Sequence, residues 1–119
     1  MPRPDDDLFL EHMLKHAQEA VGMIAGKRRK DLEKERMLEL ALVKLVEIVG
    51  EAAGRVSSAR QLEYPEIPWR EVIGMRNRLI HGYSSIDLDV LWDTVEIDLP
   101  PLIAQLERIL RISDPADLR

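Results

Sequence analysis

Cysteine is absent from the sequence. Without thiols the chain can form no disulfide, no cysteine-ligated zinc site and no thiol nucleophile, so its three histidines are the only side chains left for nitrogen ligation or for proton transfer near neutral pH. No apolar run approaches membrane-spanning length, and the first residues lack the basic start, apolar middle and cleavage site of a secretory signal. We therefore expect a cytoplasmic protein that does not enter a membrane.

Positive charge is also in short supply, because the formal net charge is -5. A protein that coats nucleic acid by bulk attraction needs clustered lysine and arginine, so any nucleic-acid site here must be local. Two basic clusters exist, one at Lys27–Lys30 and one that comprises Arg70, Arg76 and Arg78. The first lies between two helical patterns, where it fits a solvated connection as well as a phosphate-contacting surface.

The chain also lacks internal repeats, low-complexity tracts, a glycine-rich phosphate loop and any supported serine, histidine and acid arrangement. Helical periodicity is present instead, almost from end to end, in a composition of 45% hydrophobic and 33% charged residues. The 119 residues suffice for one core but not for two. We expect a single all-α domain over residues 1–119, folded as an up-and-down bundle of four main helices.

The first two helices follow from apolar residues that recur at intervals of three and four. The first should run from Asp6 to about Ile24, and the second from about Leu38 to Val56. The polar strip of the second helix is narrow, so several neighbouring helices or a second subunit must cover the rest of its surface. We therefore expect a homodimer.

The periodicity fails over residues 57–68, which predicts an irregular connection. A third helix should begin with Pro68 at its first position and end at Gly82. Polar residues of chemical interest then fall near the C-terminal end of this helix.

Asp87 is suited to cap a fourth helix. The pair Pro100-Pro101 must bend or split that helix, or force it to restart from a cap at Asp98. Beyond this helix, residues 113–119 should form a loose tail.

Polar residues interrupt the third predicted helix between Gly74 and Tyr83. Arg76 offers a permanent cation with a fork of donors that matches phosphate oxygens, and His81 can exchange a proton near neutral pH. A nuclease that uses the 2'-hydroxyl of RNA as its nucleophile needs such a base and such a cation, and no metal. On a helix these two residues lie about 140° apart, whereas Asn77 is one turn from His81 and could orient it. From spacing alone, a helix cap and a surface salt bridge remain the simpler explanation.

The segment Met75–Tyr83, which reads Met-Arg-Asn-Arg-Leu-Ile-His-Gly-Tyr, resembles the signature of HEPN domains: an arginine, a polar residue, three further residues and a histidine. The pair Gly82-Tyr83 makes the segment similar to the HepT-like toxin branch in particular. Flanking residues extend the likeness over Ile67–Leu110, while the first half of the chain matches in helical pattern and length alone.

This resemblance implies a dimer of helical bundles whose motif helices meet in a shared cleft, where RNA is cleaved without metal or cofactor. Arg76 and His81 would be catalytic, and Asn77 and Arg78 would bind or orient the RNA. The family also implies a toxin–antitoxin pair, in which a small nucleotidyltransferase neutralises the toxin and can attach AMP to Tyr83. Without the resemblance, a packed tyrosine explains Tyr83 more simply. The alternative functions are a non-catalytic HEPN module that binds nucleotide or RNA, and a purely structural helical dimer.

Two further groups of residues carry weaker indications. His12, His16 and Glu19 have a spacing on the first helix that can hold a metal, but the same positions form its polar face, which is the better explanation. Trp69 and Trp92 could stack on bases, but both lie on apolar helical positions. We expect these two rings in the core or in an interface.

Overall fold

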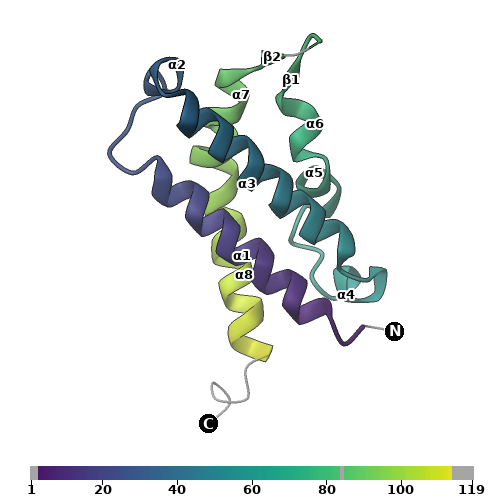
Figure 1. Cartoon of the computed structure of the whole chain (residues 1–119). Helices are drawn as coiled ribbons and strands as arrows, with labels where there is room; N and C mark the ends of the chain where they lie inside the picture. The colour runs from purple at the N-terminus through teal and green to yellow at the C-terminus, as the bar shows by residue number, and fades with distance from the viewer. Residues whose placement is uncertain (1–2, 84, 114–119) are drawn as a thin grey trace.

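The computed structural model describes residues 3–83 and 85–113 as a set of helices with one very small sheet (Figure 1). In chain order the elements are α1 (Asp6–Met23), α2 (Asp31–Lys34), α3 (Arg36–Arg55), α4 (Ser58–Glu63), α5 (Trp69–Ile73), α6 (Met75–Leu79), β1 (Ile80–His81), β2 (Ser85–Ile86), α7 (Leu88–Asp93), the π-helix η1 (Thr94–Asp98) and α8 (Leu99–Ser113). The predicted all-α class is confirmed. Apart from Ser113, the predicted tail lies outside the described residues.

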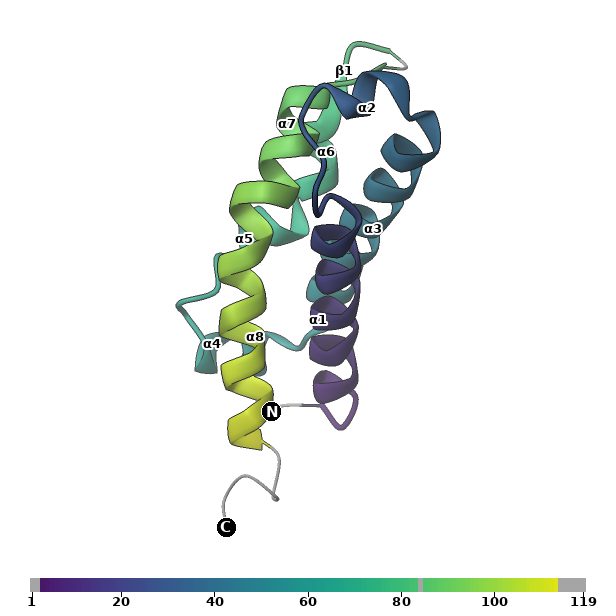
Figure 2. The ribbon, with the colours of Figure 1, turned by 90° about the vertical axis from the view of Figure 1, so that its left-hand side faces the viewer.

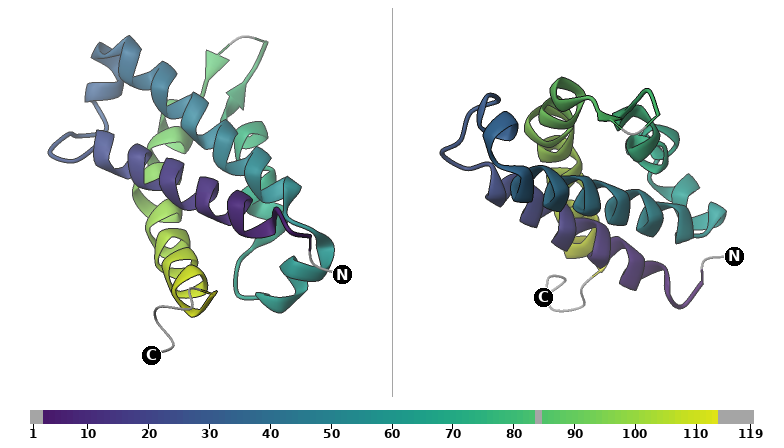
Figure 3. Two further views of the ribbon diagram at one scale, coloured as in Figure 1. Left: turned by 60° about the horizontal axis from the view of Figure 1, so that its bottom comes forward. Right: turned by 45° about the horizontal axis from the view of Figure 1, so that its top comes forward.

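The long helices α1 and α3 lie side by side and run in opposite directions in every view (Figures 1 and 3). The segment α5–α6 packs on α3, and the rod formed by α7, η1 and α8 packs across α1 (Figure 2). Each long segment therefore reverses the direction of the one before it, as in an up-and-down bundle. Within the part of the chain that the structure describes, no helix combines the length and the apolar character needed to cross a membrane.

The core extends along α1, which packs against α3 and against α8. The predicted bounds of the first two long helices are confirmed to within two residues. Apolar residues recurring at intervals of three and four bring one side of each helix into this core. Its most deeply buried side chains include Leu10, Met13 and Ala17 of α1, Leu42, Val46 and Val49 of α3, and Leu99, Leu106 and Ile109 of α8.

A glycine on α3 sets how closely α5 approaches. A Cβ atom built on Gly50 would lie 3.1 Å from the carbonyl oxygen of Val72 and 3.2 Å from that of Ile73. These contacts are with backbone, which cannot rotate away as a side chain can. The absence of a side chain at Gly50 therefore lets the backbone that leads into α6 lie directly against α3.

The prediction of an irregular connection over residues 57–68 is wrong for its first part, because this part forms α4. Ser57 caps that helix, with its hydroxyl oxygen accepting from the backbone N–H of Arg60 at 3.3 Å. Ser57 itself is held by Asp6, which lies 51 positions earlier in the chain. The helix ends before Pro65, so the predicted effect of the prolines is confined to the second part of the connection.

The third helix differs from the prediction at three points. Pro68 precedes α5 instead of occupying its first position. Gly74 divides the helix into α5 and α6. Finally, α6 ends at Leu79, and the chain continues as a β-hairpin through His81 instead of remaining helical to Gly82.

The fourth helix begins as predicted, because the Asp87 side chain accepts a hydrogen bond from the backbone N–H of Val90 at 3.1 Å. The predicted restart from an Asp98 cap is wrong, since Asp98 lies inside η1 and Leu99 after it is helical with φ -71° and ψ -39°. The irregularity that Pro100-Pro101 requires takes the form of η1, immediately before the prolines. Its wider turn avoids the clash between a proline ring and the carbonyl four residues earlier.

Candidate functional site

The polar residues of the motif lie on the outer side of α6. Met75 and Leu79 are 3% and 0% exposed, so this side of the helix faces the core. Successive helical residues are about 100° apart, so Asn77 points away from the core with Arg76 on one side of it and Arg78 on the other. All three polar side chains are exposed.

Arg76 is oriented by a carboxylate of α3. Its Nε donates to Oε2 of Glu47 at 3.0 Å, and Oε1 of Glu47 accepts from Nζ of Lys44 at 3.2 Å. The hydrogen bonds from Lys44 and Arg76 hold the pKa of Glu47 below its usual value, although burial of the carboxylate acts in the opposite direction. Among the described residues, no acceptor lies within hydrogen-bonding distance of the two terminal amino groups of Arg76. These groups are therefore available to a phosphate.

Arg78 lies on the opposite side of α6, at a groove. Its Nη2 is 4.0 Å from Oδ2 of Asp98, beyond hydrogen-bonding distance. Both residues line a groove of about 510 Å³ between α5–α6 and η1–α8, which Glu66 and Glu71 also line. The other cation and the histidine of the motif do not line this groove. Three carboxylates against the single cation of Arg78 make the groove unfavourable as a path for a long phosphate chain, while a single phosphate at its edge can still contact Arg78.

His81 lies on a two-stranded hairpin. It pairs with Ser85 in the antiparallel register of β1 and β2. Gly82 follows it with φ 73°, a left-handed conformation that favours glycine. The backbone N–H of Asp87 donates to the carbonyl oxygen of Leu79 at 2.7 Å and closes the base of the hairpin. The imidazole is therefore presented by a turn, and its side chain is exposed.

The helical relations expected for His81 are consequently wrong. Asn77 is not one helical turn from His81, and the angle of about 140° between Arg76 and His81 does not apply, since the helix ends between them. Within residues 3–83 and 85–113, no hydrogen bond links His81 to either residue. The described residues of one chain thus present the cation near the start of α6 and the imidazole just after its end, with no hydrogen bond between them.

Tyr83 stands at the tip of the hairpin. The residue is 102% exposed, as much as in an extended peptide. The explanation of a packed tyrosine is therefore wrong. Its phenol is open to a second protein and lies two residues from His81.

The weaker candidates are the two histidines of α1 and the two tryptophans. His16 Nδ1 lies 2.6 Å from Oε1 of Glu19, and the ring of His12 meets that of His16 edge-on. No group of three potential ligands that could hold a metal occurs in the described part of the chain. Trp92 is 7% exposed in the core, and the Trp69 indole N–H donates to two backbone carbonyls, so both tryptophans have structural positions as predicted.

The sequence did not single out Glu47 and Asp98 as residues of the site. Glu47 is 29 positions from Arg76, and Asp98 is 20 positions from Arg78. The one available signal for Glu47 is its place in the narrow polar strip of α3, which does not specify a partner. The packing of α6 against α3 creates the first pair, and the position of α6 across the groove from η1 creates the second.

Residues 13–109 match the family described as HepT-like, ribonuclease HepT-like. A protein of Caldanaerobacter subterraneus subsp. tengcongensis, named provisionally as an RNase, is 32% identical over 92% of this chain and 95% of its own length. Another provisionally named RNase, from Methanocaldococcus jannaschii, is 27% identical over 93% of this chain and 92% of its own length. A Thermococcus cleftensis protein named provisionally as ribonuclease HepT is 39% identical over 63% of this chain and 68% of its own length. No solved structure matches the chain significantly.

Proposed function

The chain belongs to the HepT-like ribonuclease family, and we propose that it is an endoribonuclease that cleaves RNA without a metal or cofactor. One observation carries the proposal. The guanidinium of Arg76, near the start of α6, and the imidazole of His81, in the hairpin that directly follows α6, are both exposed and lie five residues apart in the chain. They are the cation and the proton carrier that cleavage by a neighbouring hydroxyl requires.

In the proposed reaction, His81 removes the proton of a 2'-hydroxyl, and the resulting oxygen attacks the adjacent phosphorus. The bond from phosphorus to the 5'-oxygen breaks, and the departing oxygen takes up a proton. The products are a 2',3'-cyclic phosphate and a 5'-hydroxyl end. Arg76 stabilises the additional negative charge on the phosphorane, while Asn77 and Arg78 bind or orient the RNA strand. The nucleophile belongs to the substrate, so no metal is needed to activate water.

We further propose that the cleft is completed by a second copy of the chain. Ile73 and Ile80 are 43% and 45% exposed, and they lie before and after α6, whose outermost residue is Asn77. Apolar side chains around an outward polar residue suit a symmetric contact between two motif helices. Such a homodimer would also bring the Arg76 of one copy toward the His81 of the other. Sedimentation should give a dimer, and Ile80→Asp should yield monomers with little activity.

The third part of the proposal concerns regulation by a small nucleotidyltransferase antitoxin in the cytoplasm. The exposed phenol of Tyr83 would attack the α-phosphorus of ATP, so that AMP becomes bonded to the tyrosine oxygen and pyrophosphate leaves. The added negative charge would lie near His81 and repel RNA. Mass spectrometry after incubation with the antitoxin and ATP should locate AMP on Tyr83. Modification elsewhere would contradict this part alone.

The ribonuclease proposal is tested by cleavage of single-stranded RNA in the presence of a chelator. We expect cleavage to persist in wild type and to fall about 100-fold or more in His81→Ala and in Arg76→Ala. His12→Ala and Arg108→Ala are matched controls, because both residues are exposed and lie outside the motif. RNA with 2'-O-methyl groups should resist cleavage. Loss of activity with chelator, or full activity in both motif variants, would contradict the mechanism.

A non-catalytic module that binds RNA or nucleotide is the second candidate. The absence of any hydrogen bond between Arg76 and His81 among the described residues of one chain favours it. Under this alternative, wild type binds RNA, and purified dimer leaves the RNA intact.

A further inference from the structure

The hairpin end of the molecule holds a basic segment in an otherwise acidic chain. Residues 27–36 contain six basic and three acidic side chains, a net charge of +3, whereas the whole chain carries -5. This segment comprises the second part of the connection after α1, the short helix α2, Glu35 and the first residue of α3. The local excess of positive charge is therefore opposite in sign to the charge of the protein.

Half of these cations are occupied by carboxylates. Lys27 donates to both oxygens of Glu35 at 3.0 Å, and Arg36 pairs with Glu39 at 2.8 Å. The third neutralised cation is Arg29, which donates to Asp89 of α7. A nearby carboxylate neutralises each of these three cations, so they contribute little to the attraction of an anion.

The other three cations are Arg28, Lys30 and Lys34, which we call the basic edge. All three are exposed, and none has a side-chain partner among the described residues. The neighbouring carboxylates are already engaged, since Asp31 accepts from the backbone N–H of Arg28 at 2.8 Å and Glu33 lies 3.8 Å from Arg29. The basic edge thus retains charge for a ligand outside the chain.

Contacts with α7 hold the basic edge beside the hairpin. Arg29 Nε donates to Oδ1 of Asp89 at 2.6 Å, and α2 packs against α7. Helix α7 begins two residues after β2, the strand paired with the one that carries His81. Figures 1 and 2 show α2 and the hairpin at the same end of the molecule, opposite the C-terminal end of α8.

We infer that single-stranded RNA leaving the motif passes the hairpin and contacts the basic edge through its phosphates, an inference that rests on the proposed ribonuclease function. The route on the other side of α6 is unfavourable, because the groove there is lined by Glu66, Glu71 and Asp98. The backbone of RNA carries one negative charge per nucleotide, so it is attracted to lysine and arginine without regard to base sequence. The basic edge would add affinity for long RNA and leave the chemistry at the motif unchanged.

The test compares two variants of equal charge. The basic-edge variant carries the three substitutions Arg28→Ala, Lys30→Ala and Lys34→Ala. The control variant carries Lys15→Ala, Arg108→Ala and Arg111→Ala. These substitutions remove three exposed cations of α1 and α8, which also have no side-chain partner within the described residues. Binding to uncleavable 2'-O-methyl RNAs of about 16 and about four nucleotides is measured by fluorescence anisotropy at several salt concentrations.

For the long RNA, we expect the basic-edge variant to bind about 10- to 100-fold more weakly than wild type. The slope of log K against log salt concentration should become shallower by about 2, because each lost phosphate contact removes about 0.7 from it. The control variant should change less than about threefold in affinity, and the short RNA should bind all three proteins alike. Equal losses in both variants, or a loss for the short RNA as large as for the long one, would overturn the inference.

Failure of the function and failure of the RNA path give different results. A wild-type chain that cleaves RNA while the basic-edge variant keeps full affinity for the long RNA contradicts the path alone. If the basic-edge variant binds long RNA selectively more weakly but wild type does not cleave unmodified RNA, the result supports the RNA path and contradicts the ribonuclease proposal.

Discussion

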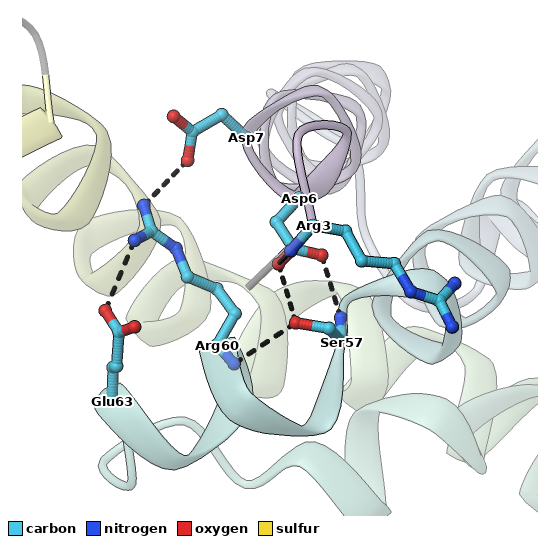
Figure 4. A network of polar contacts seen from close by, with 6 residues as sticks. All are labelled: Arg3, Asp6, Asp7, Ser57, Arg60 and Glu63. Carbon is cyan, nitrogen blue, oxygen red and sulfur yellow. Dashed lines mark hydrogen bonds and ion pairs between the residues drawn. The ribbon is translucent and has the colours of Figure 1, made fainter. Parts of the chain in front are cut away.

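Replacement of Asp6 should destabilise the fold more than replacement of any exposed acid around it. Asp6 is 2% exposed and joins the start of α1 to the connection between α3 and α4 (Figure 4). Its Oδ1 accepts from the backbone N–H of Ser57 at 2.8 Å, and its Oδ2 accepts from the Ser57 hydroxyl at 2.6 Å and from the backbone N–H of Arg3 at 2.7 Å. Asp6→Ala removes all three hydrogen bonds and leaves the partly buried donors without this acceptor.

Hydrogen bonds to a charged group contribute about 1.5 to 3 kcal/mol each, and losses within one network are not additive. We therefore expect Asp6→Ala to lower the free energy of unfolding by about 2 to 4 kcal/mol at pH 7. For a domain of this size that corresponds to a fall in Tm of about 8 to 16 °C. Urea unfolding followed by circular dichroism measures the first quantity, and a thermal scan measures the second.

The effect should depend on pH in a defined direction. Desolvation alone would raise the pKa of Asp6, but the hydrogen bonds from Ser57 and Arg3 outweigh it and lower the pKa below its ordinary value. A carboxylate with a lowered pKa stabilises the folded state above the unfolded value of about 3.9 and loses this contribution as the pH falls through the folded value. The difference between wild type and Asp6→Ala should therefore shrink below about pH 4.

The neighbouring Asp7 provides the control. It is exposed and pairs with Arg60 at 2.7 Å, so Asp7→Ala should reduce the free energy of unfolding by less than about 1 kcal/mol (Figure 4). Equal losses of stability in both variants, or a deficit of Asp6→Ala that stays constant from pH 7 to about pH 2, would contradict this role of Asp6.

Gly50→Val should lower the free energy of unfolding by about 1 to 3 kcal/mol in urea titrations, because its Cβ would press on the Val72 carbonyl. Gly22→Ala has open space around the new Cβ and should instead raise the free energy of unfolding by about 0.5 to 1 kcal/mol. A stable Gly50→Val protein would show that α5 can move from α3 at little cost. Glu47→Gln should change the unfolding free energy by less than about 1 kcal/mol but lower kcat for RNA severalfold without raising KM, because Arg76 loses its orienting carboxylate. An increase in KM alone would contradict that positioning role.

The sequence predicts those features that depend on near neighbours. The spacing of apolar residues is enough to define α1 and α3, and the Asp87 cap bonds to a residue only three positions away. Helix α4 could not be predicted in this way, because its cap residue Ser57 is fixed by Asp6 from the far end of the chain. The partner of Arg76 also depends on the packing of α6 against α3, which no local pattern encodes.

The termination of α6 determines how the motif can act. Apolar spacing extends the helical pattern through Ile80, but Gly82 with φ 73° and the 2.7 Å bond from the Asp87 N–H to the Leu79 carbonyl favour a hairpin there. Arg76 is consequently fixed by the packing of α6 on α3, whereas His81 is fixed by the hairpin. The geometry between cation and imidazole then depends on two separately stabilised units, so each can be perturbed without unfolding the other. A substitution in the turn should alter cleavage more than stability, whereas one that displaces α5–α6 from α3, such as Gly50→Val, should alter both.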